Sequence, residues 1–468
     1  MTTAMSRDRR RAVLLMASLS SFLTPFMNSS VTVALPAIAQ EFELNAILLS
    51  WVATSYILAA VVFLVPLGRM ADLAGRKKIF RSGIILFMVA ACACALAPRS
   101  GWFIFFRVLQ GAGSAMIFST SVAILVAVTP AGERGRVLGI NTAAVYLGLS
   151  LGPVLGGLLT QHLGWRSIFL LNVPLGVLVL FLIKRYLVEE WKEGRGESFD
   201  SPGSLIYGAS LTAIMLGFTF LPAIPGVLLI AAGVGGVVGF VFWEQRTAHP
   251  VLNISLFRGN PIFSFSNLAA LINYSATFAV MFLLSLFLQH VKGYNPQLTG
   301  WILLSQPLIQ ALFSPLAGRL ADRSQPRLVA STGMCLTAIG LFSLSFLSSS
   351  TALVLIVLNL LLLGLGFAFF SSPNTTAIMS AVEKKHLGVA SATLATMRLV
   401  GQMLSMGITT LVFALVLGPR EIGAGSRFFF MKSMKVAFLI FAALCGMGIL
   451  ASLARGKVIK NFGVDADV

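Results

Sequence analysis

The chain has 468 residues, of which 57% are hydrophobic and only 11% are charged, and its mean hydropathy is +0.90. A soluble domain carries about a quarter charged residues, so this composition excludes an ordinary cytosolic protein, a disordered chain and a disulfide scaffold. Too few charged residues remain to cover so much apolar surface, and lipid is the solvent that suits it. The four cysteines all lie in apolar runs and are interpreted as small buried side chains.

Fourteen long apolar runs follow one another along the chain, separated by short polar or Gly/Pro-rich loops. Their approximate ranges are 12–36, 46–67, 79–97, 102–128, 137–160, 167–187, 203–221, 226–243, 262–290, 298–317, 328–348, 351–378, 388–417 and 433–453. The first run follows three arginines, as in a secretory signal, but it is longer than the apolar region of a signal peptide. The runs are continuous and about twice as long as the strands of a membrane barrel. The sequence therefore predicts an all-α integral membrane protein with 14 transmembrane helices.

Lysine and arginine are distributed unevenly between the two sets of loops. With the N-terminus in the cytoplasm, 25 of the 34 Lys and Arg residues lie in the cytoplasmic set and 7 in the opposite set. The positive-inside rule therefore predicts a protein of the plasma (inner) membrane with both termini in the cytoplasm. This asymmetry also accounts for the net charge of +18 without a nucleic-acid partner.

Two cytoplasmic loops carry nearly the same residues, which indicates an internal repeat. Gly68–Arg76 reads GRMADLAGR and Gly318–Arg323 reads GRLADR, 250 residues later. Both copies must face the cytoplasm, so an even number of helices separates them, and eight helices give a normal length of about 31 residues for each helix with its loop. We therefore expect a six-helix half at 1–187, a linker with two inserted helices at 188–261, and a second six-helix half at 262–468.

Four motifs appear in order at the expected helices. They are GRMADLAGRKK at Gly68–Lys78, RVLQGAG at Arg107–Gly113, GLSLGPVLGG at Gly148–Gly157, and SPN at Ser372–Asn374 leading to Gly388–Ser391. Over nearly its whole length the chain resembles the major facilitator superfamily, and more narrowly the fourteen-helix branch of drug:proton antiporters. The resemblance implies the major facilitator fold, transport rather than enzyme catalysis, no cofactor and no metal, and a monomer.

The gating and coupling candidates are four charged residues. Asp72 and Arg76 are spaced i, i+4, so one helical turn would let them pair; Asp322 is the counterpart of Asp72 in the second half. In the family that the chain resembles, this Asp lies near a helix N-terminus of the other half and helps to latch the outward-facing state; we expect the receiver near 387–389. Arg107 is a full charge inside an apolar run, which is expensive unless the residue has a function or a polar partner. A solvated turn for Asp72 and a structural tie for Arg107 remain the alternatives.

Polar residues inside the runs are the candidates for a substrate cavity. They are Asn28, Thr32, Tyr56, Gln110, Asn141, Asn273, Tyr274, Gln306, Gln310 and Arg398. Each one alone is better explained by a hydrogen bond between helices than by contact with a substrate. As a set they outline a large cavity of mixed polar and apolar character.

One departure from the family pattern affects the substrate and the coupling. The branch typically carries an Asp in its first helix, and Met27 stands at that position; all sixteen acidic residues lie in loops, termini or span ends. A cation would find no carboxylate in the cavity, whereas Arg107 makes it positive, so we expect neutral or anionic substrates rather than cationic ones. Proton coupling would have to use Asp72, Glu41, Glu244 or the substrate's own proton.

The sequence thus predicts a secondary active transporter that exports small amphipathic molecules by alternating access, with proton antiport. An uncoupled uniporter or an anion or lipid translocator is the first alternative, because the helix-1 acid is missing. A membrane sensor or scaffold that does not transport is an alternative of another class.

Overall fold

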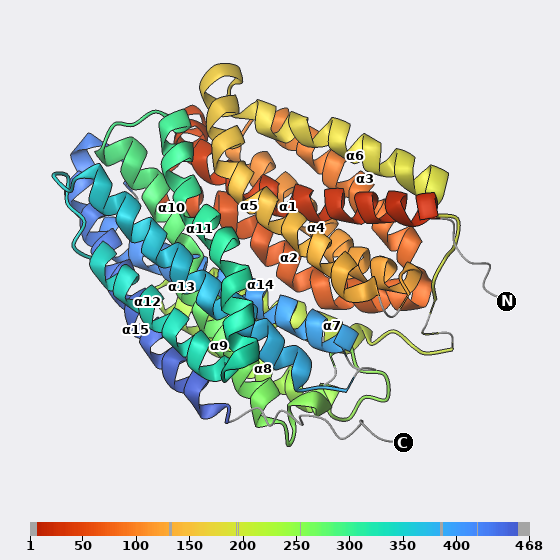
Figure 1. Ribbon diagram of the computed structural model, residues 1–468. Helices are drawn as coiled ribbons and strands as arrows, with labels where there is room; N and C mark the ends of the chain where they lie inside the picture. Colours follow the sequence, from red (N-terminus) through yellow and green to blue (C-terminus); the bar gives the residue numbers. More distant parts are fainter. Residues whose placement is uncertain are drawn as a thin grey trace.

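The computed structural model describes residues 7–130, 133–192, 194, 196–252, 254–383, 387–418 and 420–456. Thirteen helical stretches in these ranges are long and apolar enough to cross a bilayer. A further helix, α11 (Pro296–Arg323), has 28 residues but a less apolar sequence. With α11 the spans follow the predicted order, and the chain is an integral membrane protein built from helices (Figure 1).

The first six helices pack together as one group. They are α1 (Arg7–Phe42), α2 (Ala46–Ala74), α3 (Arg76–Ala95), α4 (Ser100–Val128), α5 (Arg134–Leu163) and α6 (Arg166–Tyr186). The side chain of Asn45 caps α2 by accepting a hydrogen bond from the amide of Leu48 at 2.9 Å. Gly75 separates α2 from α3 with φ at 121°, a conformation that L side chains rarely adopt. The short turn between α2 and α3 is therefore fixed by this glycine.

The second group of helices follows in the last 208 residues of the chain, after the short helix η2 (Ile254–Phe257). Besides α11 it contains α9 (Pro261–Thr277), α10 (Ala279–Leu286), η3 (Phe287–Val291), α12 (Pro326–Leu344), α13 (Leu353–Ser380), α14 (Leu387–Val412), η5 (Phe413–Leu417), η6 (Ala424–Ser426) and α15 (Arg427–Ala454). Proline begins α9, α11 and α12, where its missing amide hydrogen leaves no intrahelical bond unmade. Three of these elements, α9, α10 and η3, continue into one another and form a single span.

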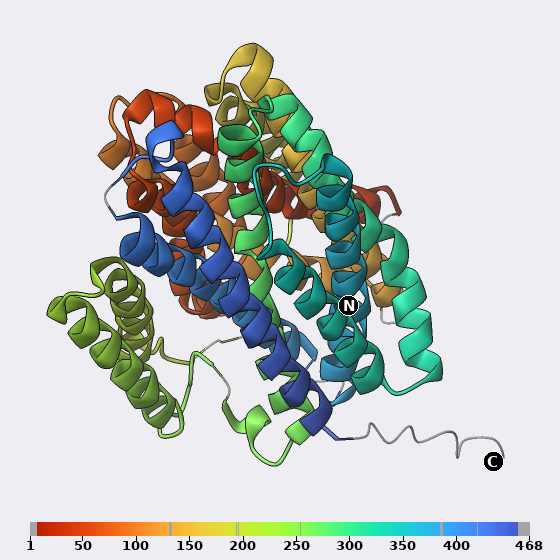
Figure 2. The same ribbon diagram turned by 90° about the vertical axis from the view of Figure 1, so that its left-hand side faces the viewer.

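The two remaining helices, α7 (Ser201–Phe220) and α8 (Ile224–Glu244), form a hairpin at one side of the bundle (Figure 2). The α7 helix contacts both groups. On the first group, the Tyr207 hydroxyl donates to the carbonyl of Val61 at 3.3 Å, and Trp51 Nε1 donates to Thr219 Oγ1 at 3.0 Å. On the second group, the ring of Phe218 lies 2.6 Å from where a Cβ on Gly407 of α14 would stand.

Several predicted span limits are wrong because the helices extend beyond the apolar runs. The run predicted at 12–36 is a helix at Arg7–Phe42, and the run predicted at 298–317 is a helix at Pro296–Arg323. Helical hydrogen bonding continues past the hydrocarbon edge, where charged and polar side chains reach water. Hydropathy therefore marks the membrane-embedded part of each helix and not its ends.

The two groups meet at the end of the bundle that contains the α1–α2 turn, which we call the closed end. There Ser50 Oγ lies 2.8 Å from Thr410 Oγ1, and the side chains of Ser285 and Gln289 donate to the carbonyls of Thr32 and Val33 at 2.8 and 3.0 Å. Close backbone approach of α5 and α11 completes this contact: Gly157 faces Pro296, and Gly300 faces Pro153. Gly157 and Gly300 therefore form a tight seam between the groups, whereas Gly148, Gly152 and Gly156 of the same α5 sequence lie against α1 within the first group.

Candidate substrate and coupling site

The predicted pair of Asp72 and Arg76 is formed, but not within one helix as expected. Arg76 Nε donates to Asp72 Oδ1 at 2.9 Å, and Arg76 Nη2 lies 2.8 Å from the same oxygen. The helix α2 ends at Ala74, so the pair spans the break at Gly75 and joins the end of α2 to the start of α3. The ion pair therefore holds the α2–α3 turn in shape.

The segment after α6 lies over this turn, which the sequence did not predict. The Glu190 carboxylate accepts a hydrogen bond from the Lys77 amide at 2.8 Å, in the first turn of α3, where a negative charge is favoured. The amide of Gly194 donates to the carbonyl of Asp72 at 3.2 Å. Glu197 forms an ion pair with Arg69, and this contact holds the pKa of the Glu197 carboxyl below its usual range. The segment from 187 to 200 is thus attached to the turn by several independent contacts.

Part of the predicted gate lies outside what the structure describes. Asp322 belongs to the last turn of α11, but its side chain is among those not described. The expected receiver at 387–389 is the first turn of α14, which the structure describes apart from the Leu387 side chain. Docking of Asp72 on the second group therefore stays a prediction.

Arg107 is fully buried in α4 and is held by neutral partners. Its Nε donates to the carbonyl of Val52 at 3.1 Å, and its Nη1 donates to Gln110 Oε1 at 2.7 Å. The guanidinium carbon lies 4.4 Å from the centre of the Tyr56 ring, a cation–π distance. Nη2 has no hydrogen-bond partner, and in the part of the chain that the structure describes no carboxylate pairs with this arginine. The predicted residues Tyr56, Arg107 and Gln110 thus form one cluster.

A second arginine–tyrosine pair lies in the other group. Arg398 of α14 donates through Nη2 to Thr375 Oγ1 at 3.0 Å, and its guanidinium carbon lies 5.6 Å from the centre of the Tyr274 ring. The Tyr274 ring packs edge-on against Phe367 at 5.5 Å between ring centres. Arg398 Nε has no hydrogen-bond partner. Each group therefore presents an arginine that lies against a tyrosine ring and keeps unused hydrogen-bonding capacity.

Among the described residues, no hydrogen bond joins the other predicted cavity residues to either cluster. Thr32 donates to the carbonyl of Asn28 on its own helix at 3.1 Å, which accounts for the Thr32 hydroxyl by local structure. Asn141, Asn273, Gln306 and Gln310 are all buried, and the first three keep a polar side-chain atom without a protein partner. A buried polar atom without a partner is unfavourable in an apolar bundle unless water or a ligand reaches it. Asn141, Asn273 and Gln306 are therefore the stronger cavity candidates.

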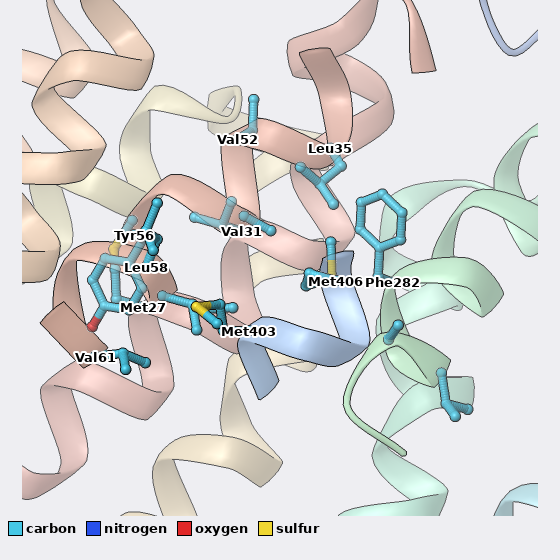
Figure 3. Close-up of a cluster of buried hydrophobic side chains, with 14 of the residues drawn as sticks. Met27, Val31, Leu35, Val52, Tyr56, Leu58, Val61, Phe282, Met403 and Met406 are labelled. Carbon is cyan, nitrogen blue, oxygen red and sulfur yellow. The ribbon is translucent and has the colours of Figure 1, made fainter. Parts of the chain in front are cut away.

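Met27, where the family pattern has an acid, is a member of the buried apolar core and contacts the amide of Asn172. Its side chain is buried, and its sulfur accepts a hydrogen bond from Asn172 Nδ2 at 3.0 Å. Figure 3 shows it in one cluster with Met403 and Met406 of α14 and Phe282 of α10. The side chain at this position therefore packs between the two groups of helices and cannot bind a proton.

The sequence missed Arg455, which it counted as a loop residue. The residue is 1% exposed, and its guanidinium donates to Ser266 Oγ, Asn374 Oδ1, Ser452 Oγ and the carbonyl of Pro326 at 2.8–3.2 Å. Burial lowers the pKa of this guanidinium to about 10. Arg455 ties together α9, α12, α13 and α15, and only its place at the end of an apolar run could have signalled this role.

Comparison with characterised proteins identifies the relatives of this chain. It is 27% identical over 444 residues to the riboflavin transporter RibZ of Clostridioides difficile, covering 94% of this chain and 96% of that protein. It is 36% identical over 394 residues to the multidrug resistance protein Stp of Mycobacterium tuberculosis, covering 82% and 72%. The tetracenomycin C resistance and export protein of Streptomyces glaucescens is 28% identical and matches 87% of this chain and 77% of its own length.

Solved structures share the fold at low sequence identity. A bacterial homologue of the human lysosomal transporter Spinster superposes with a TM-score of 0.67 at 17% identity, over 96% of this chain and 98% of that chain. The xylose transporter XylE of Escherichia coli gives a TM-score of 0.63 at 15% identity, over 97% and 98%. The family model of the Major Facilitator Superfamily matches residues 17–268 and 266–460. The chain therefore belongs to the Major Facilitator Superfamily of transporters, as its motifs predict.

Proposed function

We propose that this transporter exports small amphipathic molecules, neutral or anionic rather than cationic, by alternating access of its two groups of helices. The halves are residues 1–187 and 262–468, and 188–261 hold the linker and the inserted hairpin. The closed end faces the outside of the cell, because the positive-inside rule places the arginine-rich loops and both termini in the cytoplasm. Relatives named for multidrug resistance and antibiotic export support the direction of transport.

The observation that carries the substrate class is the buried Arg107, which pairs with no acid in the described part of the chain. Its Nη2 is free to donate, and so is the Nε of Arg398 in the other half. A cation entering between these arginines would meet like charge and no carboxylate, because Met27 occupies the place of the family's acid. A carbonyl, phenolate or carboxylate oxygen would complete the unused hydrogen bonds. Neutral and anionic amphiphiles therefore fit best.

The second candidate function is transport without proton coupling, as a uniporter or an anion or lipid translocator. Two observations favour it: the apolar packing of Met27, and Asp72 being already engaged with Arg76 at the α2–α3 turn. Coupling through Asp72 requires that this pair opens during the cycle. A sensor or scaffold without transport is the remaining class, and a flux measurement separates it from both.

The test uses inside-out membrane vesicles energised with a proton gradient. Uptake of a lipophilic cation dye and of an anionic amphiphilic dye is followed with and without a protonophore. We expect uptake of the anionic dye, and an Arg107→Gln variant that loses most of it. The matched control is Arg99→Gln, because Arg99 is exposed and immediately precedes the same helix.

Each outcome discriminates between the candidates. Anionic uptake that the protonophore abolishes, and that Asp72→Asn also removes, supports proton antiport. Anionic uptake indifferent to the protonophore selects the uncoupled transporter. If only the cationic dye is taken up, and its uptake is unchanged in Arg107→Gln, the proposed substrate class is contradicted. If neither dye is taken up, the result points to the sensor or scaffold.

A further inference from the structure

Two acidic side chains meet at the base of the α7–α8 hairpin. Asp200 directly precedes α7, and Glu244 is the last residue of α8. They are 6% and 3% exposed. A Cβ on Gly203 would stand 2.8 Å from Glu244 Oε1, with Asp200 Oδ2 closer still. The two carboxyl groups therefore face each other across one small buried space.

The hydrogen-bond donors around the pair are distributed unequally. Asp200 accepts from the amide of Gly203 at 2.9 Å and from Trp243 Nε1 at 3.1 Å to each carboxyl oxygen. Glu244 accepts from the amide of Leu252 at 2.9 Å through Oε2, whereas its Oε1, which faces Asp200, has no partner. More donors stabilise the charge on Asp200, so it is the better acceptor of the two.

Neighbouring cations are engaged elsewhere. Arg69 of α2 pairs with Glu197 of the linker, and His249 lies 3.9 Å from the same carboxylate. Arg258 donates to Gln245, and Arg246 is exposed. Within the described ranges, which leave out residues 193, 195 and 253, no lysine, arginine or histidine forms an ion pair with either acid. The hydrogen-bond donors favour one charged carboxylate, but no cation in that part of the chain balances a second one.

We propose that Asp200 and Glu244 form a proton-binding site, in which Glu244 Oε1 carries the proton and donates a hydrogen bond to the ionised Asp200. Two carboxyl groups this close in a buried space cannot both be charged without a cation, so they share one proton and titrate as a unit. The shared proton also fills the unpaired hydrogen-bonding position of Oε1. This site is separate from Arg107 and from the α2–α3 turn.

Because the Asp200–Glu244 pair lies at the base of the hairpin, loss of its proton would affect how the hairpin packs. The pair closes the base of a hairpin whose first helix contacts α2 through Tyr207 and Trp51, and α14 through Phe218 beside Gly407. Loss of the proton would leave two negative charges at this base and force the hairpin ends apart or let water enter. The two inserted helices thus connect an ionisable group to both halves of the transporter.

The test is infrared difference spectroscopy of the purified full-length protein in lipid nanodiscs, titrated over roughly pH 5 to 9, which lies above the ordinary carboxyl pKa values of about 4. We expect a carboxylic-acid C=O stretching band that persists at neutral pH, where exposed Asp and Glu are ionised. Glu244→Gln should abolish the band. Asp200→Asn should abolish it at neutral pH too, because the new side-chain amide would donate to the Glu244 carboxylate and stabilise its charge. The asparagine oxygen also preserves the cap of α7.

The control is Glu43→Gln, at an exposed acid at the closed end, which should leave the band unchanged. A monodisperse elution profile and an unfolding temperature near that of the native chain verify that each variant is folded. The proposal is overturned if no protonated carboxyl is seen at neutral pH, or if the band survives in both pair variants. The experiment needs no transported substrate, so its result does not depend on the proposed export activity.

Discussion

Adding one methyl group at the α5–α11 seam should open the closed end. A Cβ on Gly157 would stand 3.0 Å from the carbonyl carbon of Pro296 and 3.1 Å from the Cα of Gln297, with the Pro296 carbonyl oxygen closer still. A Cβ on Gly300 would stand 2.8 Å from the carbonyl carbon of Pro153. These neighbours are backbone atoms of the opposite half, so they move only if the helices separate.

The size of the effect follows from the clash. Overpacking a well-packed contact costs about 1–3 kcal/mol. The methyl group meets these atoms only while the halves are together at this end, so the whole penalty falls on the closed arrangement. A difference of about 1–3 kcal/mol changes the ratio of two conformations by roughly 5- to 150-fold. Gly157→Ala and Gly300→Ala should each reduce the population closed at this end by that factor.

The assay is a distance measurement between spin labels at the seam. Labels at Leu163→Cys and Leu298→Cys report on the ends of α5 and α11, where both native side chains are exposed. The four native cysteines are replaced first. The native chain should give a short distance, and the alanine variants a larger share of long distances.

The control is Gly139→Ala in the same helix, where an added Cβ meets nothing within 4 Å. Its gain in helix propensity equals that of Gly157→Ala, so the comparison isolates the clash. If Gly157→Ala and Gly139→Ala give the same distance distribution, the seam does not hold the closed end, and the reasoning from the glycine contacts fails.

Three further predictions concern single side chains. Arg107→Lys should lower vesicle transport about tenfold or more, because an ammonium group cannot both donate to Val52 and Gln110 and stack on the Tyr56 ring in the same geometry; transport at the native rate would contradict this. Arg455→Met should lower the free energy of unfolding by about 1–3 kcal/mol for each buried acceptor that it leaves unpaired. The thermal unfolding midpoint in detergent measures this loss, and an unchanged midpoint would show that Arg455 does not hold the four helices together. Glu197→Gln should speed amide hydrogen exchange in the linker at neutral pH, because the variant loses the ion pair with Arg69. In acid, below the lowered pKa of Glu197, the native carboxylate is protonated and also loses its attraction to Arg69, so both proteins should exchange alike. Equal exchange at neutral pH would show that the ion pair does not fasten the linker.

Much of the fold is readable from the sequence, because a lipid-embedded backbone must form helices and its apolar runs must match the bilayer. The order of the fourteen spans and the family followed from those runs and from motifs such as the one at Gly68–Lys78. The pairing of Asp72 with Arg76 was also readable, since the two residues are close in the chain. Local geometry and composition are sufficient for such features.

Contacts between distant segments were decided only by the tertiary structure. Nothing in the chain order indicates that Glu190 reaches the first turn of α3, that Arg455 is buried among four helices, or that Asp200 and Glu244 face each other. Hydropathy and spacing report on one helix at a time. The charge, burial and hydrogen bonding of these groups depend instead on which helix ends the packed bundle brings together, and that is set by side-chain packing between helices far apart in the sequence.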